Sequence, residues 1–171
     1  MTIPKNTTKY ILIFFTGAFV GYLYEVIFYY FTDNAFINRG VLYGLWLPIY
    51  GVGAVVLLFL KPLKKNPLFL FSTMMLVTGI IEYIAGYILL NFFDMRLWDY
   101  RGLFLNIDGF ICLRSLLTFA IGGVILIYLV EPIIEKVVAK QSKTLNVAII
   151  ALIFLFIADT TLSILFRTPH S

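Results

Sequence analysis

Residues 10–31, YILIFFTGAFVGYLYEVIFYYF, contain one charged side chain, Glu25. An α-helix needs about 20 mostly apolar residues to cross the hydrocarbon core of a bilayer. The stretch does not alternate between apolar and polar residues, so it does not have the pattern of a membrane β-strand. It therefore predicts a membrane-spanning helix.

Four further stretches have the same character. We predict an all-α fold, a polytopic transmembrane helical bundle with about five spans, that forms one domain over residues 1–171. A loop that re-enters the membrane or lies in its interface is expected between the third and fourth spans. The spans are expected at about residues 10–31, 41–60, 68–91, 110–130 and 145–166.

The composition excludes several classes of protein. Of the 171 residues, 61% are hydrophobic and only 13% are charged, whereas about 25% are charged in a typical soluble domain. The net charge of +4 is spread over short loops, so no nucleic-acid partner is expected. With one cysteine, Cys112, and one histidine, His170, we expect no metal site and no cofactor. No motif for nucleotide hydrolysis or for a catalytic nucleophile is present, so catalytic residues stay unassigned.

The basic residues indicate an orientation. With five spans, the termini lie on opposite sides, and the N-terminal side holds residues 1–9, 61–67 and 131–144. Every lysine lies in these segments, whereas every arginine lies at or near the other face. Cytoplasmic loops carry the excess of basic residues. We therefore expect a multi-pass protein of the plasma membrane with a cytoplasmic N-terminus and an external C-terminus.

Three carboxylates lie at a similar depth in the predicted spans. Glu25, Glu82 and Asp159 are each about 14–15 residues from the cytoplasmic end of their span, which corresponds to roughly 21–23 Å. Arg114 and Tyr50 reach the same layer from two other spans. Ionisable residues inside a membrane usually mark a functional site. The alternative is a set of ion pairs that only locks the bundle.

The external loops add polar side chains to this layer. One loop covers residues 32–40, and a longer one, Asp94 to Gly109, mixes charged, aromatic and aliphatic residues. The longer loop is expected to cover the site or to anchor in the headgroup region. The candidate binding residues are Glu25, Asn38, Arg39, Tyr50, Glu82, Trp98, Asp99, Arg101, Asn106, Asp108, Arg114 and Asp159.

A series of short motifs occurs in order along the chain. It runs Tyr24-Glu25, Asn38-Arg39-Gly40, Pro48-Ile49-Tyr50-Gly51, Glu82-Tyr83, Trp98-Asp99-Tyr100 and Asn106-Ile107-Asp108-Gly109-Phe110-Ile111-Cys112-Leu113. From about residue 15 to about residue 125 the chain resembles the CmpB-like family of small bacterial membrane proteins, which are assigned as type IV ABC-transporter permeases. The resemblance implies an ATPase partner.

The chain departs from the family pattern at two positions. Family members often have arginine at the position of Phe110 and glutamate at that of Asn91. Arg114, one helical turn after Phe110, is a candidate replacement for the arginine.

Three functions are compatible with these features. The first is a permease or substrate-capture subunit that binds a polar or anionic solute, or a lipid headgroup, in an outward-facing pocket of Glu and Arg side chains. The second is a membrane-embedded enzyme that acts on an outer-leaflet lipid or lipid-linked substrate by carboxylate acid–base chemistry. The third is a structural membrane partner with a locked ion network. The expected partners are the lipid bilayer, an ATPase or other membrane subunit, and a second copy of the chain.

Overall fold

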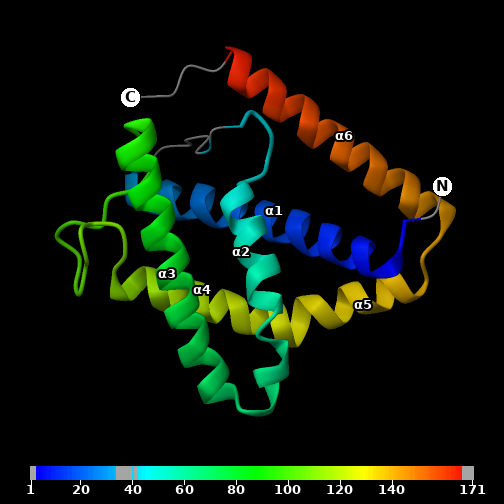
Figure 1. Cartoon of the computed structure of the whole chain (residues 1–171), viewed down its shortest axis with the longest axis horizontal. Coiled ribbons are helices and arrows are strands. Elements are labelled where there is room, and N and C mark those ends of the chain that lie inside the picture. Colours follow the sequence, from blue (N-terminus) through cyan, green and yellow to red (C-terminus); the bar gives the residue numbers. More distant parts are fainter. Residues whose placement is uncertain (1–2, 34–39, 41, 167–171) are drawn as a thin grey trace. The chain divides into compact units, whose positions relative to one another are not determined.

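The computed structural model describes residues 3–33, 40 and 42–166. In this part of the chain every regular element is helical, as predicted (Figure 1). The chain folds as two compact units, residues 1–55 with 131–171 and residues 56–130. The elements are α1 (Lys5–Asp33), α2 (Pro48–Leu58), the 3-10 helix η1 (Lys61–Lys65), α3 (Pro67–Phe93), α4 (Leu113–Ile125), the π-helical turn η2 (Leu126–Val130), α5 (Glu131–Ala139) and α6 (Lys143–Phe166).

Four helical segments are long and apolar enough to cross a membrane. They are Lys5–Phe31, Pro67–Phe93, Leu113–Ala139 and Lys143–Phe166. Large apolar side chains are exposed along them, for example Leu76 at 64%, Phe154 at 70% and Ile164 at 74%. Such exposure suits lipid, since a soluble protein rarely leaves so much apolar surface in water. The chain is therefore a multi-pass membrane protein.

The predicted span at residues 41–60 contains a shorter helix than expected. α2 begins at Pro48 and has 11 residues, which corresponds to about 16 Å and to roughly half of the hydrocarbon core. Proline fits the first turn of a helix but interrupts a helix that runs through it, because its nitrogen carries no hydrogen. The residues before Pro48 form other bonds: Leu47 N donates to Ala18 O at 3.0 Å.

The glycine pair in α1 packs α1 against α2 inside the first unit. A Cβ atom on Gly17 would lie 2.6 Å from the Cβ of Ala54, and one on Gly21 would overlap the ring of Tyr50. Small residues four apart let helix backbones approach closely in membranes. From the sequence, Gly17 and Gly21 could equally pack against a helix of a partner chain. In the structure they pack against α2 of the same chain.

The other end of α1 is held by polar contacts to the C-terminal part of the first unit. The Lys9 ammonium forms ion pairs with Glu131 and with Glu135, the latter at 2.7 Å. Gln141 donates to Thr8 Oγ1 at 3.1 Å and to Ile3 O at 2.9 Å. Glu131 and Thr8 are completely buried. These bonds tie the start of α1 to α5 and to the turn that precedes α6.

The second unit is built around the pair α3 and α4. Small residues again allow the close approach, since a Cβ atom on Gly79 would lie 2.7 Å from Leu116 and one on Gly123 would lie 2.7 Å from the sulfur of Met74. At the loop end of α3, Gly86 makes room for the ring of Phe110. The pair thus supports the loop of residues 94–112 that joins the two helices.

Candidate functional site

The loop of residues 94–112 is folded back on itself. Tyr100 N donates to Gly109 O at 2.9 Å, Ile107 N to Ile111 O at 3.0 Å and Leu113 N to Phe104 O at 3.2 Å. Cys112 and Ser115 then form a reciprocal capping box at the start of α4. Because so many backbone groups are bonded inside it, the loop holds its side chains in place.

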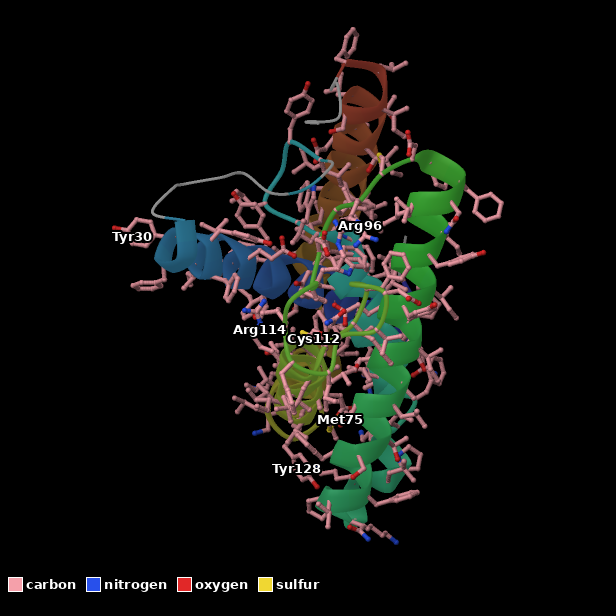
Figure 2. All side chains as sticks on the ribbon, turned by 90° about the vertical axis from the view of Figure 1, so that its left-hand side faces the viewer. Tyr30, Met75, Arg96, Cys112, Arg114 and Tyr128 are labelled. Atoms are coloured by element: carbon pink, nitrogen blue, oxygen red, sulfur yellow. The ribbon has the colours of Figure 1, made fainter. Side chains whose placement is uncertain are left out.

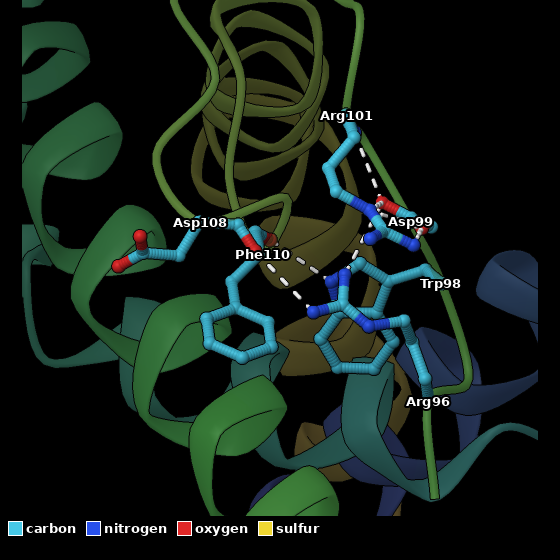
Figure 3. A network of polar contacts seen from close by, with 6 residues as sticks. All are labelled: Arg96, Trp98, Asp99, Arg101, Asp108 and Phe110. Carbon is cyan, nitrogen blue, oxygen red and sulfur yellow. Dashed lines mark hydrogen bonds and ion pairs between the residues drawn. The ribbon is translucent and has the colours of Figure 1, made fainter.

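Arginine and aspartate side chains in this loop bond to one another (Figure 3). Asp99 accepts from Arg101 Nε at 2.8 Å and from the Arg101 backbone N–H at 3.0 Å. Arg96 Nη1 lies 3.2 Å from the same carboxylate, and the Arg96 guanidinium stacks 5.0 Å from the centre of the Phe110 ring. We call Arg96, Trp98, Asp99, Arg101, Asp108 and Phe110 the loop network.

The electrostatics of the loop network follow from these bonds. Hydrogen bonds from Arg101, followed by its charge and that of Arg96, lower the pKa of Asp99 to about 2. The same contacts raise the pKa of Arg101. Asp99 is therefore ionised throughout the physiological range, and its charge is shared by two arginines.

Trp98, Asn106 and Asp108 also have bonds within the loop or to α3. Trp98 Nε1 donates to Phe110 O at 2.9 Å, and Asn106 Nδ2 to Leu103 O at 2.9 Å. Asp108 accepts from the Tyr83 hydroxyl at 2.7 Å. Of the predicted site residues, these three hold the loop in shape.

Glu82 lies on α3 beneath the loop and is 6% exposed. Its Oε1 accepts from the Tyr100 hydroxyl at 2.9 Å. The Ser115 side chain is also close to the carboxylate, although its hydroxyl is placed to donate to Cys112 O at 3.0 Å. In the described part of the chain, Oε2 of Glu82 is buried and makes no hydrogen bond of good geometry.

Tyr100 joins Glu82 to Arg114. The guanidinium of Arg114, on the first turn of α4, lies 6.0 Å from the centre of the Tyr100 ring. Arg114 itself is exposed (Figure 2). Glu82, Tyr100, Arg114 and Ser115, called here the Glu82 cluster, thus bring two predicted site residues to either side of one tyrosine.

Tyr100 and Ser115 are not among the predicted site residues. From the sequence, the tyrosine indicates only an aromatic side chain suited to the headgroup region. Its place in the Trp98-Asp99-Tyr100 string, between two charged residues, is the signal that could have marked it. For Ser115, the signal is its position beside Arg114.

The remaining predicted residues belong to the first unit. Glu25 Oε1 accepts from the Tyr50 hydroxyl at 2.9 Å. Asp159 accepts from Tyr43 N at 3.1 Å, from Gly44 N at 3.0 Å and from Trp46 Nε1 at 2.6 Å. Asp159 therefore anchors residues 43–46, which precede α2, to α6.

The structure does not test two features of the predicted site, and both stay predictions. Asn38 and Arg39 lie outside the described residues. Glu25 and Glu82 belong to different units, so their convergence stays a prediction. Within the described ranges, no group of three or more His, Cys, Asp or Glu side chains could hold a metal ion.

Residues 12–164 match the model of the CmpB family, whose description is "Putative ABC-transporter type IV". The chain belongs to this family. The match extends beyond the segment of resemblance found in the sequence, since it also includes η2, α5 and nearly all of α6. Comparison with curated proteins and with solved structures gave no match. Family and apolar helices together indicate a membrane protein of the transport type.

Proposed function

We propose that this CmpB-family protein is a transport subunit that binds a polar or anionic solute, or a lipid headgroup, at the Glu82 cluster. The observation that supports this proposal is the hydrogen bonding of the two Glu82 carboxylate oxygens. One oxygen is bonded to Tyr100, and the other is buried and lacks a hydrogen bond of good geometry among the described residues. A buried acceptor without a donor destabilises a fold by about 1–3 kcal/mol, and more when it is charged. A ligand that brings a donor removes this cost.

Arg114 suggests the second feature of the ligand. Its guanidinium lies beside the Tyr100 ring and is exposed. Guanidinium groups bind carboxylates and phosphates through paired, charge-assisted hydrogen bonds. The solute class that fits is therefore a small molecule with a hydroxyl or ammonium donor for Glu82 and an anionic group for Arg114.

The arginines of the loop network are less suited to capture a ligand. Arg101 makes several bonds to Asp99, and Arg96 is held by Asp99, by Asp108 O and by the Phe110 ring. A ligand anion would have to displace Asp99 to bind them. We assign these residues to the shape of the loop and Arg114 to the ligand.

A structural role is the second candidate function, and the loop network favours it. Arg96 and Arg101 both form ion pairs with Asp99 without any ligand, as in a locked ion network, although Arg96 Nη1 makes no hydrogen bond of good geometry among the described residues. The Glu82 cluster differs, because Arg96 Nη1 faces the opposite charge of Asp99, whereas the buried Glu82 Oε2 has neither an ion pair nor a hydrogen bond of good geometry among the described residues. This difference is the reason for placing ligand binding at the cluster.

The proposal is tested by ligand-dependent melting of the full chain in detergent. The probes are glycerol 3-phosphate and phosphoethanolamine, which carry both an anion and a donor; inorganic phosphate, glycerol and ethanolamine each provide part of this pattern. We expect a probe with both groups to raise the melting temperature of the wild type. Glu82→Gln and Arg114→Gln are expected to abolish that shift.

Arg101→Gln is the matched control, because it removes an exposed arginine from the loop that precedes α4. We expect it to keep the ligand-dependent shift. If Arg101→Gln and Arg114→Gln reduce the shift equally, the cluster has no specific part in binding. The structural role is supported instead if no probe stabilises the wild type and the Glu82→Gln variant melts far below the wild type.

A further inference from the structure

Three lysines lie close together at the end of the second unit opposite the Glu82 cluster. They belong to η1, the five-residue 3-10 helix that precedes α3. Lys61, Lys64 and Lys65 line, with Pro62, a surface hollow of about 550 Å³. None of these residues takes part in the site described above.

One of the three lysines is held in position. The hydroxyl of Tyr128, in η2, donates to the backbone oxygen of Lys64 at 2.6 Å. The ammonium of Lys64 lies 5.2 Å from the centre of the same ring. A cation over a tyrosine face is attracted by the ring quadrupole. Tyr128 therefore fixes both the backbone and the charge of Lys64 at the hollow.

The stretches of the second unit around this hollow are basic in sequence. Residues 56–81 and 115–130 contain no aspartate or glutamate. Glu82 is 15 residues along α3 from Pro67, which corresponds to roughly 22 Å and exceeds the screening length at physiological salt.

Apolar side chains flank the lysines on both sides in the chain. Phe59 is 66% exposed, Leu68 is 75% exposed and Phe69 is 56% exposed. The spanning segment Pro67–Phe93 begins directly after the lysines. The hollow thus combines cations next to a spanning segment with exposed apolar side chains that flank them in the chain.

We propose that this hollow binds the phosphate group of an anionic phospholipid. Basic residues next to a spanning helix attract anionic lipids, and the exposed Phe59, Leu68 and Phe69 suit the acyl chains of the same molecule. A free phosphate ion would use the lysines but not the apolar flank. This second site does not depend on the ligand assigned to the Glu82 cluster.

The test measures lipid binding to the detergent-purified full chain by native mass spectrometry. The probes are phosphatidylglycerol and phosphatidylcholine with identical acyl chains, and inorganic phosphate is the soluble competitor. We expect the wild type to prefer phosphatidylglycerol. The triple variant Lys61→Gln, Lys64→Gln and Lys65→Gln is expected to bind it roughly 100-fold more weakly, since each lysine near the membrane contributes about fivefold.

The matched control removes three other lysines, Lys136, Lys140 and Lys143, by the same change to glutamine. These side chains lie in the exposed α5–α6 region, and their loss lowers the net charge equally. We expect the control to keep the preference for phosphatidylglycerol. Equal losses in the two triple variants would show a general effect of charge and overturn the proposal.

A milder variant protects the test against failure of the triple variant to fold. Tyr128→Phe keeps all three lysines and the ring but removes the hydrogen bond to Lys64 O, so a loss of about two- to fivefold is expected. Unchanged lipid binding in Tyr128→Phe together with a misfolded triple variant would count against the site.

Effective competition by inorganic phosphate would indicate that the hollow binds a soluble anion. Loss of a co-purifying acidic protein, with lipid binding unchanged, would indicate a protein partner; either result would overturn the lipid assignment.

Discussion

The Tyr100 hydroxyl donates to Oε1 of Glu82 across 2.9 Å, and this bond connects the loop of residues 94–112 to a buried carboxylate of α3. A carboxylate near the middle of a bilayer costs about 2.5–3.5 kcal/mol on insertion scales. One neutral donor offsets only part of that cost. The burial of Glu82 in α3 therefore depends in part on the position of Tyr100 in the loop.

The first prediction concerns this pair. Tyr100→Phe should destabilise the protein more than Glu82→Gln, because it leaves a buried carboxylate with no tyrosine donor, at a cost of about 1–3 kcal/mol or more. Glutamine keeps an acceptor for Tyr100 and carries no charge. In the double variant the loss should be smaller than the sum of the two single losses. Melting curves of the four proteins in one detergent measure this, and additive losses would mean that the two groups are not coupled.

The second prediction concerns acid. The pKa of Asp99 is lowered from 3.8 to about 2 in the folded protein, so its contribution is complete above pH 3.8 and is lost as the pH falls through about 2. Trp98 fluorescence in a Trp46→Phe background should therefore stay constant from neutral pH down to about pH 4 and change below it. Asp99→Asn should remove that transition. A midpoint at or above about pH 4 would contradict the ion pairing of Asp99.

The third prediction compares two glycines with positive φ in the same loop. Gly109 has φ +73°, and a Cβ atom there would lie 2.7 Å from Asp99 Oδ1 and 2.8 Å from Arg101 Cγ. Gly102 has φ +86° with nothing within 4 Å of such an atom. Both changes to alanine strain the backbone by about 1–3 kcal/mol. Only Gly109→Ala should also weaken the loop network, so it should lower the melting temperature more; equal effects would show that the network adapts at no cost.

The fourth prediction concerns Asp159. Asp159→Asn replaces one of two carboxylate oxygens that together accept from Tyr43 N, Gly44 N and Trp46 Nε1. Because bonds to a charged acceptor contribute about 1.5–3 kcal/mol each, the variant should melt well below the wild type and shift the Trp46 emission. Thr161→Val is the control, since the Thr161 hydroxyl bonds only within its helix, to Ile157 O, among the contacts described. Similar melting of the two variants would remove the anchoring role of Asp159.

The sequence was sufficient for the class of fold. Membrane insertion depends on the number of consecutive apolar residues, which is a local property, and four of the five predicted stretches coincide with long apolar helices. It also selected Glu82 and Arg114, because a charge placed inside such a stretch is costly wherever it lies. The structure brings these two side chains to one tyrosine.

The tertiary structure decided what depends on contacts between distant residues. Pro48 in the sequence allows either a kinked span or a helix start, and the choice follows from the bonds of the preceding residues to Asp159, more than 100 residues away. The sequence showed Arg96, Arg101 and Asp99 only as charges in a loop. Their pairing depends on how residues 94–112 fold over α3 and α4, which no local pattern of apolar residues encodes. The length of the apolar stretches thus determined the helices, whereas contacts between residues distant in the sequence determined which charged groups bond to one another.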